Sequence, residues 1–478
     1  MSAESIRSFV ANAFASDVVP RLHEYIAIPA KSPAFDPEWE KNGHIEKAVR
    51  LLETWAKART IAGLEVEIVR LPGRTPVLLC TVPAFGGASA DADPVLLYGH
   101  FDKQPEMIGW DEKSGPWEPR REGDKLYGRG GADDGYSTFA ALTAVEALQA
   151  HGGAHTRLVV LIEGCEESGS YDLPAYVDHL QGRIGTPSLV VALDSGAGDY
   201  ERLWMTTSLR GMAAGTLEVK VLREGVHSGD ASGVVPSSFR IARMLLDRIE
   251  DPQTGRILID SFHQATPPSR AQQALDFANI VGDAVFSKFP WHGETAPMGP
   301  SATAEERAAL ALARTWSPTL SITGADGLPP IGSAGNVLRP STRLKLSLRL
   351  PPGVDSTART ADLKRILETD PPYGASVVFE PEHAADGWHA PEESGWLTAA
   401  LHEASENHFG ARAAYMGEGG TIPFMAMLGE KFPKAEFVIT GVLGPHSNAH
   451  GPNEFLHLPT AEKLTAAVAD VLRRHATR

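Results

Sequence analysis

Residues 95–102, VLLYGHFD, form an apolar run that leads directly into a histidine and an aspartate. Two other runs have the same form: residues 158–162 (LVVLI) precede Glu166 and Glu167, and residues 189–193 (LVVAL) precede Asp194. Short, unbroken, β-rich runs are typical of strands that are covered on both faces of a parallel sheet. Because ligands of open α/β sheets bind outside the carboxyl ends of the strands, we expect these polar residues to meet at one place.

Two further positions belong with this set, Asp133 in GRGGADDG (128–135) and His450 in NAHGPNE (448–454). A single histidine or aspartate at a strand end is usually a structural hydrogen-bonding group. Two histidines and several carboxylates converging on one edge instead predict a metal site. In the sequence His100-Phe101-Asp102 an extended backbone puts the two polar side chains on the same side, so Asp102 can accept the second ring N–H of His100. The alternative for this stretch is a surface turn that ends at Pro105.

The adjacent acids Glu166 and Glu167 in EGCEESGS distinguish a metal site from a structural role better than any single residue does. Neighbouring residues of an extended chain point in opposite directions, so one carboxylate can bind a cation while the other faces a bound water. Hydrolysis at a two-metal site needs a carboxylate in each of these roles, because the metals lower the pKa of a bound water and a free carboxylate must take its proton. The alternative is an acidic helix N-cap, which is the weaker interpretation because unpaired buried carboxylates are costly.

The overall composition excludes several classes of partner. The chain has 478 residues, 42% of them hydrophobic and 22% charged, which indicates a globular protein of two or more domains. Its net charge of -16 argues against nucleic acid or an anionic membrane as a partner. We find no signal peptide and no apolar run of bilayer length, and Cys80 and Cys165 lie in apolar, strand-like contexts. These features predict a cytoplasmic protein with no membrane association.

The hydrophobic periodicity divides the chain into two kinds of structure. Residues 216–222 (TLEVKVL) and 343–350 (RLKLSLRL) alternate apolar and polar residues, and a helical stretch follows each, which predicts an antiparallel open-faced α+β sandwich. Because His450 belongs with His100, this segment must be inserted into the first domain. The predicted fold is an α/β catalytic domain, with a mixed, mainly parallel sheet flanked by helices, formed by residues 1–208 and 387–478, and an inserted lid and dimerisation domain, residues 209–386. Residues 251–318 give no clear pattern.

Outside these regions we expect helices over residues 1 to about 60 and at 134–150, 237–250, 357–369, 393–408 and 459–474, and strands at 66–71, 77–82 and 437–439.

Seven motifs occur in a fixed order: GHFDKQP, LYGRGGADDG, EGCEESGS, LDSG, GVHSG, EGGTIP and AHGPNE. In this order they resemble the carnosinase and cytosolic non-specific dipeptidase group, within the aminoacylase and carboxypeptidase type of co-catalytic metallopeptidases. The resemblance covers nearly the whole chain. It implies a metallopeptidase that hydrolyses the amide bond of dipeptides through a metal-bridging hydroxide, with a glutamate as general base.

The resemblance also implies a role for each site residue. His100 and Asp194 bind one metal, Glu167 and His450 bind the other, and Asp133 bridges both. Glu166 is the general base and Asp102 the partner of His100. Each subunit holds two divalent ions, with zinc the first choice for nitrogen and oxygen ligands and manganese or cobalt as alternatives. A cis peptide bond between Asp133 and Asp134 is implied as well.

Substrate binding is expected in the inserted domain and in the EGGTIP motif. Arg349 matches the lid arginine of the resembled group and can pair bidentately with a substrate carboxylate, although a solvated strand face is the alternative. Gly419, Gly420 and Thr421 offer backbone N–H groups to an anion, or form a simple turn. His227 resembles the histidine that reaches into the active site of the partner subunit of a homodimer, and Asn336 takes a position also placed across that dimer. From the sequence without the resemblance, His227 is an ordinary loop histidine.

Two positions that are not ligands depart from the resembled motifs: Gly135-Tyr136 follows Asp134 where a lysine is usual, and Lys103 replaces a small apolar residue. An aminoacylase, a deacetylase or a desuccinylase-like amidohydrolase acting on N-acyl amino acids is the alternative enzyme. A non-catalytic binding protein that keeps the fold is the alternative from another class. Such a protein would usually have lost Glu166 or a ligand, and this chain has lost none.

Overall fold

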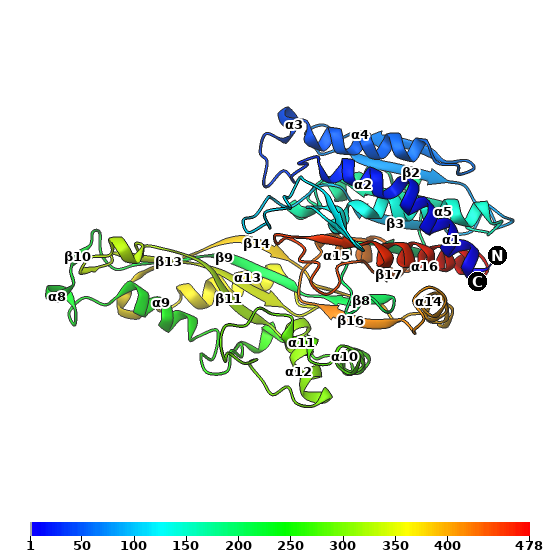
Figure 1. Cartoon of the computed structure of the whole chain (residues 1–478). Helices are drawn as coiled ribbons and strands as arrows, with labels where there is room; N and C mark the ends of the chain where they lie inside the picture. The colour runs from blue at the N-terminus through cyan, green and yellow to red at the C-terminus, as the bar shows by residue number, and fades with distance from the viewer. Residues whose placement is uncertain (1) are drawn as a thin grey trace. The chain divides into compact units, whose positions relative to one another are not determined.

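The structure, a computed structural model, describes residues 2–478 except for the side chains of His383 and Pro423. The chain divides into two compact units. Unit 1 comprises Met1–Thr207, Ala390–Met416 and Met427–Arg478, and unit 2 comprises Ser208–His389 and Gly417–Ala426. The chain therefore leaves unit 1 and later returns to it, as the colours of Figure 1 also show.

Unit 1 is built on a six-stranded sheet with the order β1-β2-β6-β3-β7-β17. Strand β3 pairs in parallel with both β6 and β7, and β17 pairs in parallel with β7, whereas β1 and β2 are antiparallel to their neighbours. Every residue of β3, β6 and β7 is buried, so both faces are covered, and the mixed α/β architecture expected from the three apolar runs is confirmed. The strands are β1 (Glu65–Val69), β2 (Val77–Val82), β3 (Val95–His100), β6 (Leu158–Glu163), β7 (Leu189–Ala192) and β17 (Glu436–Ile439).

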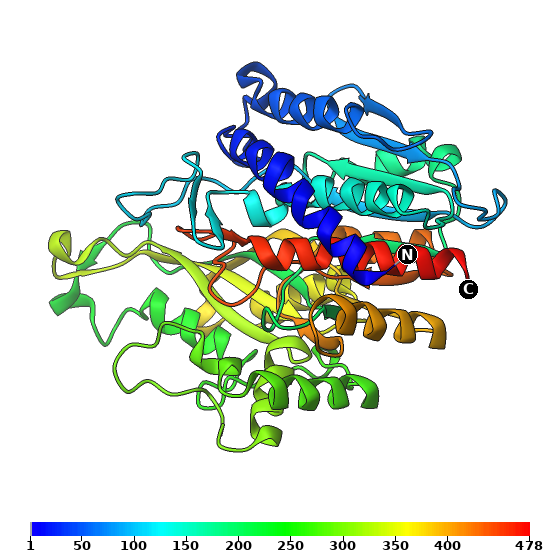
Figure 2. The ribbon, with the colours of Figure 1, turned by 45° about the vertical axis from the view of Figure 1, so that its right-hand side comes forward.

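Helices from both ends of the chain cover this sheet. Helix α5 begins just after Asp133 and Asp134, packs on β3 and is buried almost all round, as its apolar and small residues require. Helices α1 and α16, from opposite ends of the sequence, lie side by side in Figure 2 and both contact α5. The helices of unit 1 are α1 (Ala3–Ala13), α2 (Val19–Ile26), α3 (Trp39–Asn42), α4 (His44–Lys57), α5 (Tyr136–Ala150), α6 (Leu173–His179), α7 (Gln181–Ile184), α14 (Gly395–His408) and α16 (Leu458–Ala476).

Unit 2 contains a four-stranded antiparallel sheet with the order β11-β13-β9-β14. Along β13, Leu344, Leu346 and Leu348 face the core with helices α9 and α13, while Arg343 and Lys345 lie on the opposite face. This two-layer arrangement explains the period-two pattern of the sequence. The elements are β9 (Gly211–Lys220), β11 (Thr319–Asp326), β13 (Ser341–Leu350), β14 (Ser376–Ala385), α9 (Ser238–Leu246) and α13 (Ser356–Glu368).

The segment 251–318, which the sequence left unassigned, has its helices joined by long stretches of turns and coil. It contains α10 (Pro268–Val281), α11 (Ala284–Ser287) and α12 (Ala304–Thr315), and α10 and α12 pack against each other. Helix α12 begins with a capping box between Thr303 and Glu306. The other predicted helices and strands are confirmed, with ends shifted by a few residues, except that residues 27–38 of the expected N-terminal helical region form turns and coil. Among the described residues, no helix combines the length and apolarity needed to cross a membrane.

Lys103 is a structural residue that ties α2 to the end of β3. Its buried ammonium group donates to the carbonyl oxygens of Tyr25 at 2.8 Å and Ile28 at 2.9 Å, where α2 ends. A cation suits the C-terminus of a helix because the last carbonyl groups have no partner within the helix. Its methylene groups pack on Gly130, where a Cβ atom would lie 2.7 Å from them. Lys103, which departs from the resembled motif, therefore stabilises the fold and has no role in ligand binding.

Candidate metal centre and substrate-binding groups

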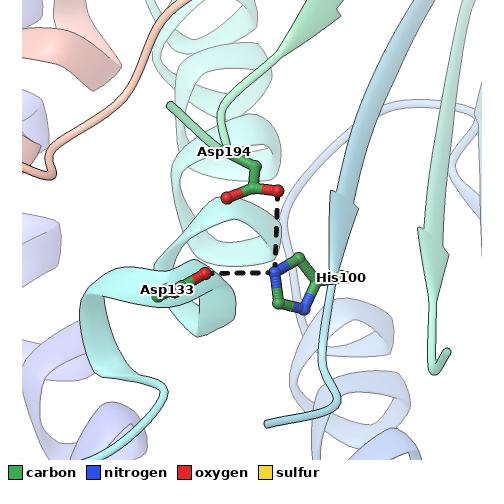
Figure 3. A group of neighbouring side chains, drawn as sticks. All are labelled: His100, Asp133 and Asp194. Carbon is green, nitrogen blue, oxygen red and sulfur yellow. Dashed lines mark ion pairs between the residues drawn. The ribbon is translucent and has the colours of Figure 1, made fainter. Parts of the chain in front are cut away.

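His100, Asp133 and Asp194 form a first group of side chains in unit 1, which Figure 3 shows. His100 is the last residue of β3, Asp194 follows the neighbouring strand β7, and Asp133 lies on the turn before α5. The Nε2 atom of His100 lies 3.3 Å from Asp133 Oδ1 and 3.7 Å from Asp194 Oδ2. The parallel pairing of β3 with β7 thus brings together residues that are nearly a hundred positions apart in the sequence.

The buried His100 ring presents a free lone pair to this group. Its Nδ1 atom lies 3.1 Å from the backbone carbonyl of Asp102, and since a carbonyl oxygen only accepts, Nδ1 carries the proton. In the neutral ring Nε2 is then the nitrogen without a proton, and it is fully buried and has no hydrogen-bond partner among the described residues. A buried nitrogen lone pair that faces carboxylates fits a metal cation, because the imidazole nitrogen and the carboxylate oxygens can all ligate it.

Asp133, Glu167 and His450 form a second group, which shares Asp133 with the first. His450 Nε2 lies 3.0 Å from Asp133 Oδ2 and 3.4 Å from Glu167 Oε2. The pairing of β5 with β18 explains this meeting, because β5 (Lys125–Tyr127) leads into the Asp133 turn and its partner β18 (Phe455–His457) follows His450. Asp133 therefore directs one carboxylate oxygen to each group. The peptide bond between Asp133 and Asp134 is cis, as the resemblance implied.

The local conformation predicted for Glu166 and Glu167 is wrong. Strand β6 ends at Glu163, and Glu166–Ser168 form a short 3-10 turn rather than extended chain. Asp102 explains the turn, because its two carboxylate oxygens accept hydrogen bonds from the backbone N–H groups of Glu166 and Glu167, both at 3.0 Å. Asp102 also differs from the prediction: its backbone carbonyl takes the His100 ring N–H, while its carboxylate is 3.5 Å from that nitrogen.

The two glutamates nevertheless differ in their surroundings. Glu167 belongs to the second group and also accepts a hydrogen bond from Gln104 at 2.6 Å. Glu166 belongs to neither group. Glu167 Oε1 is buried and has no hydrogen-bond partner among the described residues. The turn thus places the carboxylate of Glu167 among the possible metal ligands and leaves the carboxylate of Glu166 outside both groups.

The raised pKa values of the buried carboxylates also indicate a site for cations. Burial, followed by the charge of Asp194, raises the pKa of Glu166 well above its usual range, and burial and Asp133 do the same for Glu167. Burial alone would lower the pKa of His100, but the surrounding carboxylates, Asp194 first, raise it. Buried carboxylates that repel one another are stabilised by a metal ion, which binds them in the ionised form.

A buried ion pair that the sequence prediction did not single out supports His450. Arg129 Nη1 lies 2.6 Å from Glu454 Oε2, and Arg129 Nη2 donates to the carbonyl oxygens of His450 at 3.1 Å and Gly451 at 2.8 Å. The other oxygen of Glu454 accepts from the backbone of Gly130 at 2.9 Å. This network joins the two segments that carry Asp133 and His450. Arg129 lies in the motif LYGRGGADDG and Glu454 in AHGPNE, so their opposite charges could have predicted an ion pair between the two motifs.

The departure at Gly135 and Tyr136 is explained by packing. A Cβ atom on Gly135 would lie 2.0 Å from the Tyr25 ring, so only glycine fits. Tyr136 is buried, and its hydroxyl donates to the carbonyl oxygen of Leu193 at 2.5 Å. Because Leu193 precedes Asp194, Tyr136 fixes the chain that carries this member of the first group.

The expected substrate-binding residues lie in unit 2, in two groups. Arg349 Nη1 donates to Thr421 Oγ1 at 3.0 Å, which brings Arg349 together with the segment that contains Gly419 and Gly420. His227 lies on β10 (Val226–His227), which pairs with β12 (Val337–Leu338), and the backbone of Ser228 donates to the carbonyl oxygen of Asn336. His227 is exposed within the single chain.

The fold and the sequence both have known relatives. The solved structure of the dipeptidase Dug1p from Saccharomyces cerevisiae superposes with a TM-score of 0.78 at 21% identity, covering 100% of this chain and 99% of that one, which shows a shared fold. A cysteinylglycine-S-conjugate dipeptidase of Corynebacterium striatum is 26% identical over 80% of this chain and 81% of its own length. The human Beta-Ala-His dipeptidase is 24% identical over 96% of this chain and 91% of its own length.

A protein-family model covers most of the chain, from β3 to the last helix. The model, described as Peptidase family M20/M25/M40, matches residues 96–474. This range includes all of the residues of the two groups, together with Asp102, Glu166, His227 and Arg349. The chain therefore belongs to peptidase family M20/M25/M40.

Proposed function

We propose that this chain is a metal-dependent dipeptidase, which hydrolyses the amide bond of dipeptides. The observation that carries the proposal is the pair of ligand groups that share Asp133, with the carboxylate of Glu166 outside both. The relatives named as dipeptidases, which align with most of this chain, support the same substrate class.

Two divalent ions fit the residues that are present. His100, Asp133 and Asp194 would hold one ion, and Asp133, Glu167 and His450 the other, with nitrogen and oxygen donors that suit zinc first and manganese or cobalt as alternatives. When bound, such ions polarise the scissile carbonyl and lower the pKa of a water molecule. Asp102 holds the His100 ring through its backbone carbonyl, so that Nε2 stays free for this role.

Glu166 acts as the general base and acid. Its carboxylate takes a proton from the attacking water, whose oxygen forms the new bond to the carbonyl carbon. As the C–N bond breaks, Glu166 returns the proton to the leaving nitrogen, so the products are an acid and an amine. The bonds from the Glu166 and Glu167 N–H groups to Asp102 fix the turn that keeps the two carboxylates in separate roles.

Unit 2 provides the groups for the rest of the substrate. Arg349 pairs with the free C-terminal carboxylate of the dipeptide, because its planar guanidinium donates two parallel hydrogen bonds. Gly419, Gly420 and Thr421 add backbone N–H groups beside it. The Arg349 to Thr421 hydrogen bond, which lies within unit 2, supports this assignment.

We also propose a homodimer in which His227, with Asn336, acts in the partner's active site. Strand β13 runs from Ser341, beside β10 and β12, to Arg349. Eight residue steps separate Ser341 from Arg349, which is about 26 Å in a β-strand. One dipeptide cannot reach both ends, so a site that uses both His227 and Arg349 must combine two chains. The exposed side chains of Val234 (83%) and Ile331 (96%) near this end supply apolar surface for an interface.

The domain roles and the location of the protein follow from the same proposal. Residues 1–208 and 387–478 form the discontinuous catalytic domain, and 209–386 the inserted lid and dimerisation domain. The division into two compact units supports this assignment, with residues 417–426 added to the second unit. A cytoplasmic location is supported by the two unpaired buried cysteines, Cys80 and Cys165.

The substrate class is tested by a panel assay on enzyme that has been stripped of metal and reloaded with zinc, manganese or cobalt. We expect the enzyme to cleave α-linked dipeptides, β-linked dipeptides such as β-Ala-His, or both. The kcat/KM for the best dipeptide should be about tenfold or more above the kcat/KM for N-acetyl and N-succinyl amino acids. Activity should vanish after chelation and return with the ion. A preference for N-acyl amino acids would identify an aminoacylase or desuccinylase instead, and no hydrolysis of either class would favour a binding protein.

Replacement of the base should separate chemistry from metal binding. We expect Glu166→Gln to lower kcat by about 100- to 10,000-fold, because the variant cannot move the proton. The bound metal, measured by elemental analysis, should stay at the wild-type amount, since Glu166 is in neither ligand group. Glu122→Gln, which changes an exposed glutamate paired with Arg120, is the matched control and should keep full activity. Near wild-type turnover in Glu166→Gln contradicts the assignment.

A shared active site should allow two inactive variants to rescue each other. In a hybrid dimer of His227→Ala and His450→Ala, one of the two sites keeps both its metal ligands and an intact His227 from the partner. Random exchange makes half of the dimers hybrid, each with one working site, so we expect about one quarter of wild-type activity. A mixture no more active than its separate components rules out a role of His227 across the dimer.

A further inference from the structure

The end of the unit 2 sheet that carries Arg349 contains a second arginine, Arg210. This residue directly precedes β9 and is 7% exposed. Its Nε atom donates to the carbonyl oxygen of Gly419 at 3.2 Å, and its Nη1 atom donates to Ser317 O at 3.2 Å and to Thr319 Oγ1 at 2.9 Å. A buried guanidinium with three separate acceptors fixes the chain segments that supply them.

These segments are the ones that surround Arg349. Thr319 is the cross-strand partner of Arg349 between β11 and β13. On the other side, Thr421 Oγ1 accepts from Arg349 and donates to the backbone carbonyl of Arg210 at 2.6 Å. Arg210 therefore contacts both the strand neighbour and the side-chain partner of Arg349, through its guanidinium on one side and its own carbonyl on the other.

The same place has an excess of positive charge. Burial, followed by the charges of Arg349 and Arg314, lowers the pKa of Arg210 to about 10. Gly419 lies against this group, since a Cβ atom there would be 3.2 Å from Arg210 Nη2. Nη2 donates no hydrogen bond within the described part of the chain, although Nε and Nη1 both do. An anion bound beside Gly419 would meet open N–H groups and relieve the repulsion between the arginines.

We propose that Arg210 is a positioning residue for the carboxylate-binding group of Arg349, Gly419 and Thr421, and that it sets the preference for substrates with a free C-terminal carboxylate. This inference rests on the proposed dipeptidase function. Arg210 acts by holding the 419–421 segment and Thr319 in place around Arg349. A C-terminal amide has one acceptor oxygen and no charge, so it gains less than a carboxylate from the guanidinium of Arg349 and from its placement by Arg210.

The test compares one dipeptide, the best of the panel, with the same dipeptide amidated at its C-terminus, on full-length, metal-loaded enzyme. In the wild type we expect the free acid to be the better substrate. Arg210→Lys keeps the charge, but one ammonium group cannot span the three acceptors of the guanidinium. We therefore expect kcat/KM for the free acid to fall about 10- to 100-fold, mainly through KM, and kcat/KM for the amide to change much less.

Two further variants complete the design. Thr319→Val removes one of the acceptors at an edge strand and should reduce the same acid-to-amide ratio even if Arg210→Lys lowers the melting temperature. Arg343→Gln is the matched control, because Arg343 lies on the same strand as Arg349 but its guanidinium is 3.8 Å from Glu218 and Glu380 on the polar face. It should leave the ratio unchanged.

The outcomes separate the inference from the function on which it rests. An equal loss for acid and amide in Arg210→Lys and Thr319→Val, or a wild type without preference for the acid, overturns the role of Arg210 while the dipeptidase function stands. A wild type that hydrolyses no dipeptide overturns both. A ratio that falls in Arg210→Lys and Thr319→Val but not in Arg343→Gln supports the proposal.

Discussion

The repulsion between carboxylates gathered at one edge of the unit 1 sheet is the constraint on which the rest of the centre depends. Asp133, Glu166, Glu167 and Asp194 lie around a buried histidine, and burial raises the pKa of both glutamates. Such a cluster is unfavourable without positive charge, and the side chains within it that can carry such a charge are the imidazoles of His100 and His450. Two divalent ions that share Asp133 would remove this conflict, because each would bind one histidine and two carboxylates.

The surrounding fold holds this arrangement in place by hydrogen bonds to the backbone beside the possible ligands. Asp102 accepts from the backbone of Glu166 and Glu167 and receives the His100 ring N–H on its carbonyl. Arg129 and Glu454 join the Asp133 segment to the His450 segment, and Tyr136 anchors the chain before Asp194. Each of these groups acts on the backbone next to a ligand. The geometry of the centre is therefore a property of the loops at the strand ends, held by a buried scaffold.

The sequence predicted the parts of the structure that follow from short apolar runs and period-two alternation. The runs ending near His100, Glu166 and Asp194 became neighbouring strands, so their polar residues had to converge. The turn at Glu166 was predicted wrongly because a tertiary contact, the carboxylate of Asp102, decides the local backbone. The buried roles of Lys103 and Arg129 were missed for a similar reason: their partners are backbone carbonyls and a glutamate far away in the sequence. The helices of residues 251–318 are polar on much of their surface, which hides their period.

Metal stoichiometry tests the central claim most directly. Purified, stripped protein is titrated with zinc and its bound metal is counted by elemental analysis for the wild type, His450→Ala and Asp133→Asn. The shared-ligand account predicts two tightly bound ions per chain in the wild type, one in His450→Ala, and weakened binding of both in Asp133→Asn. A wild-type chain that binds no zinc, or an Asp133→Asn variant that binds two ions as tightly as the wild type, would contradict it.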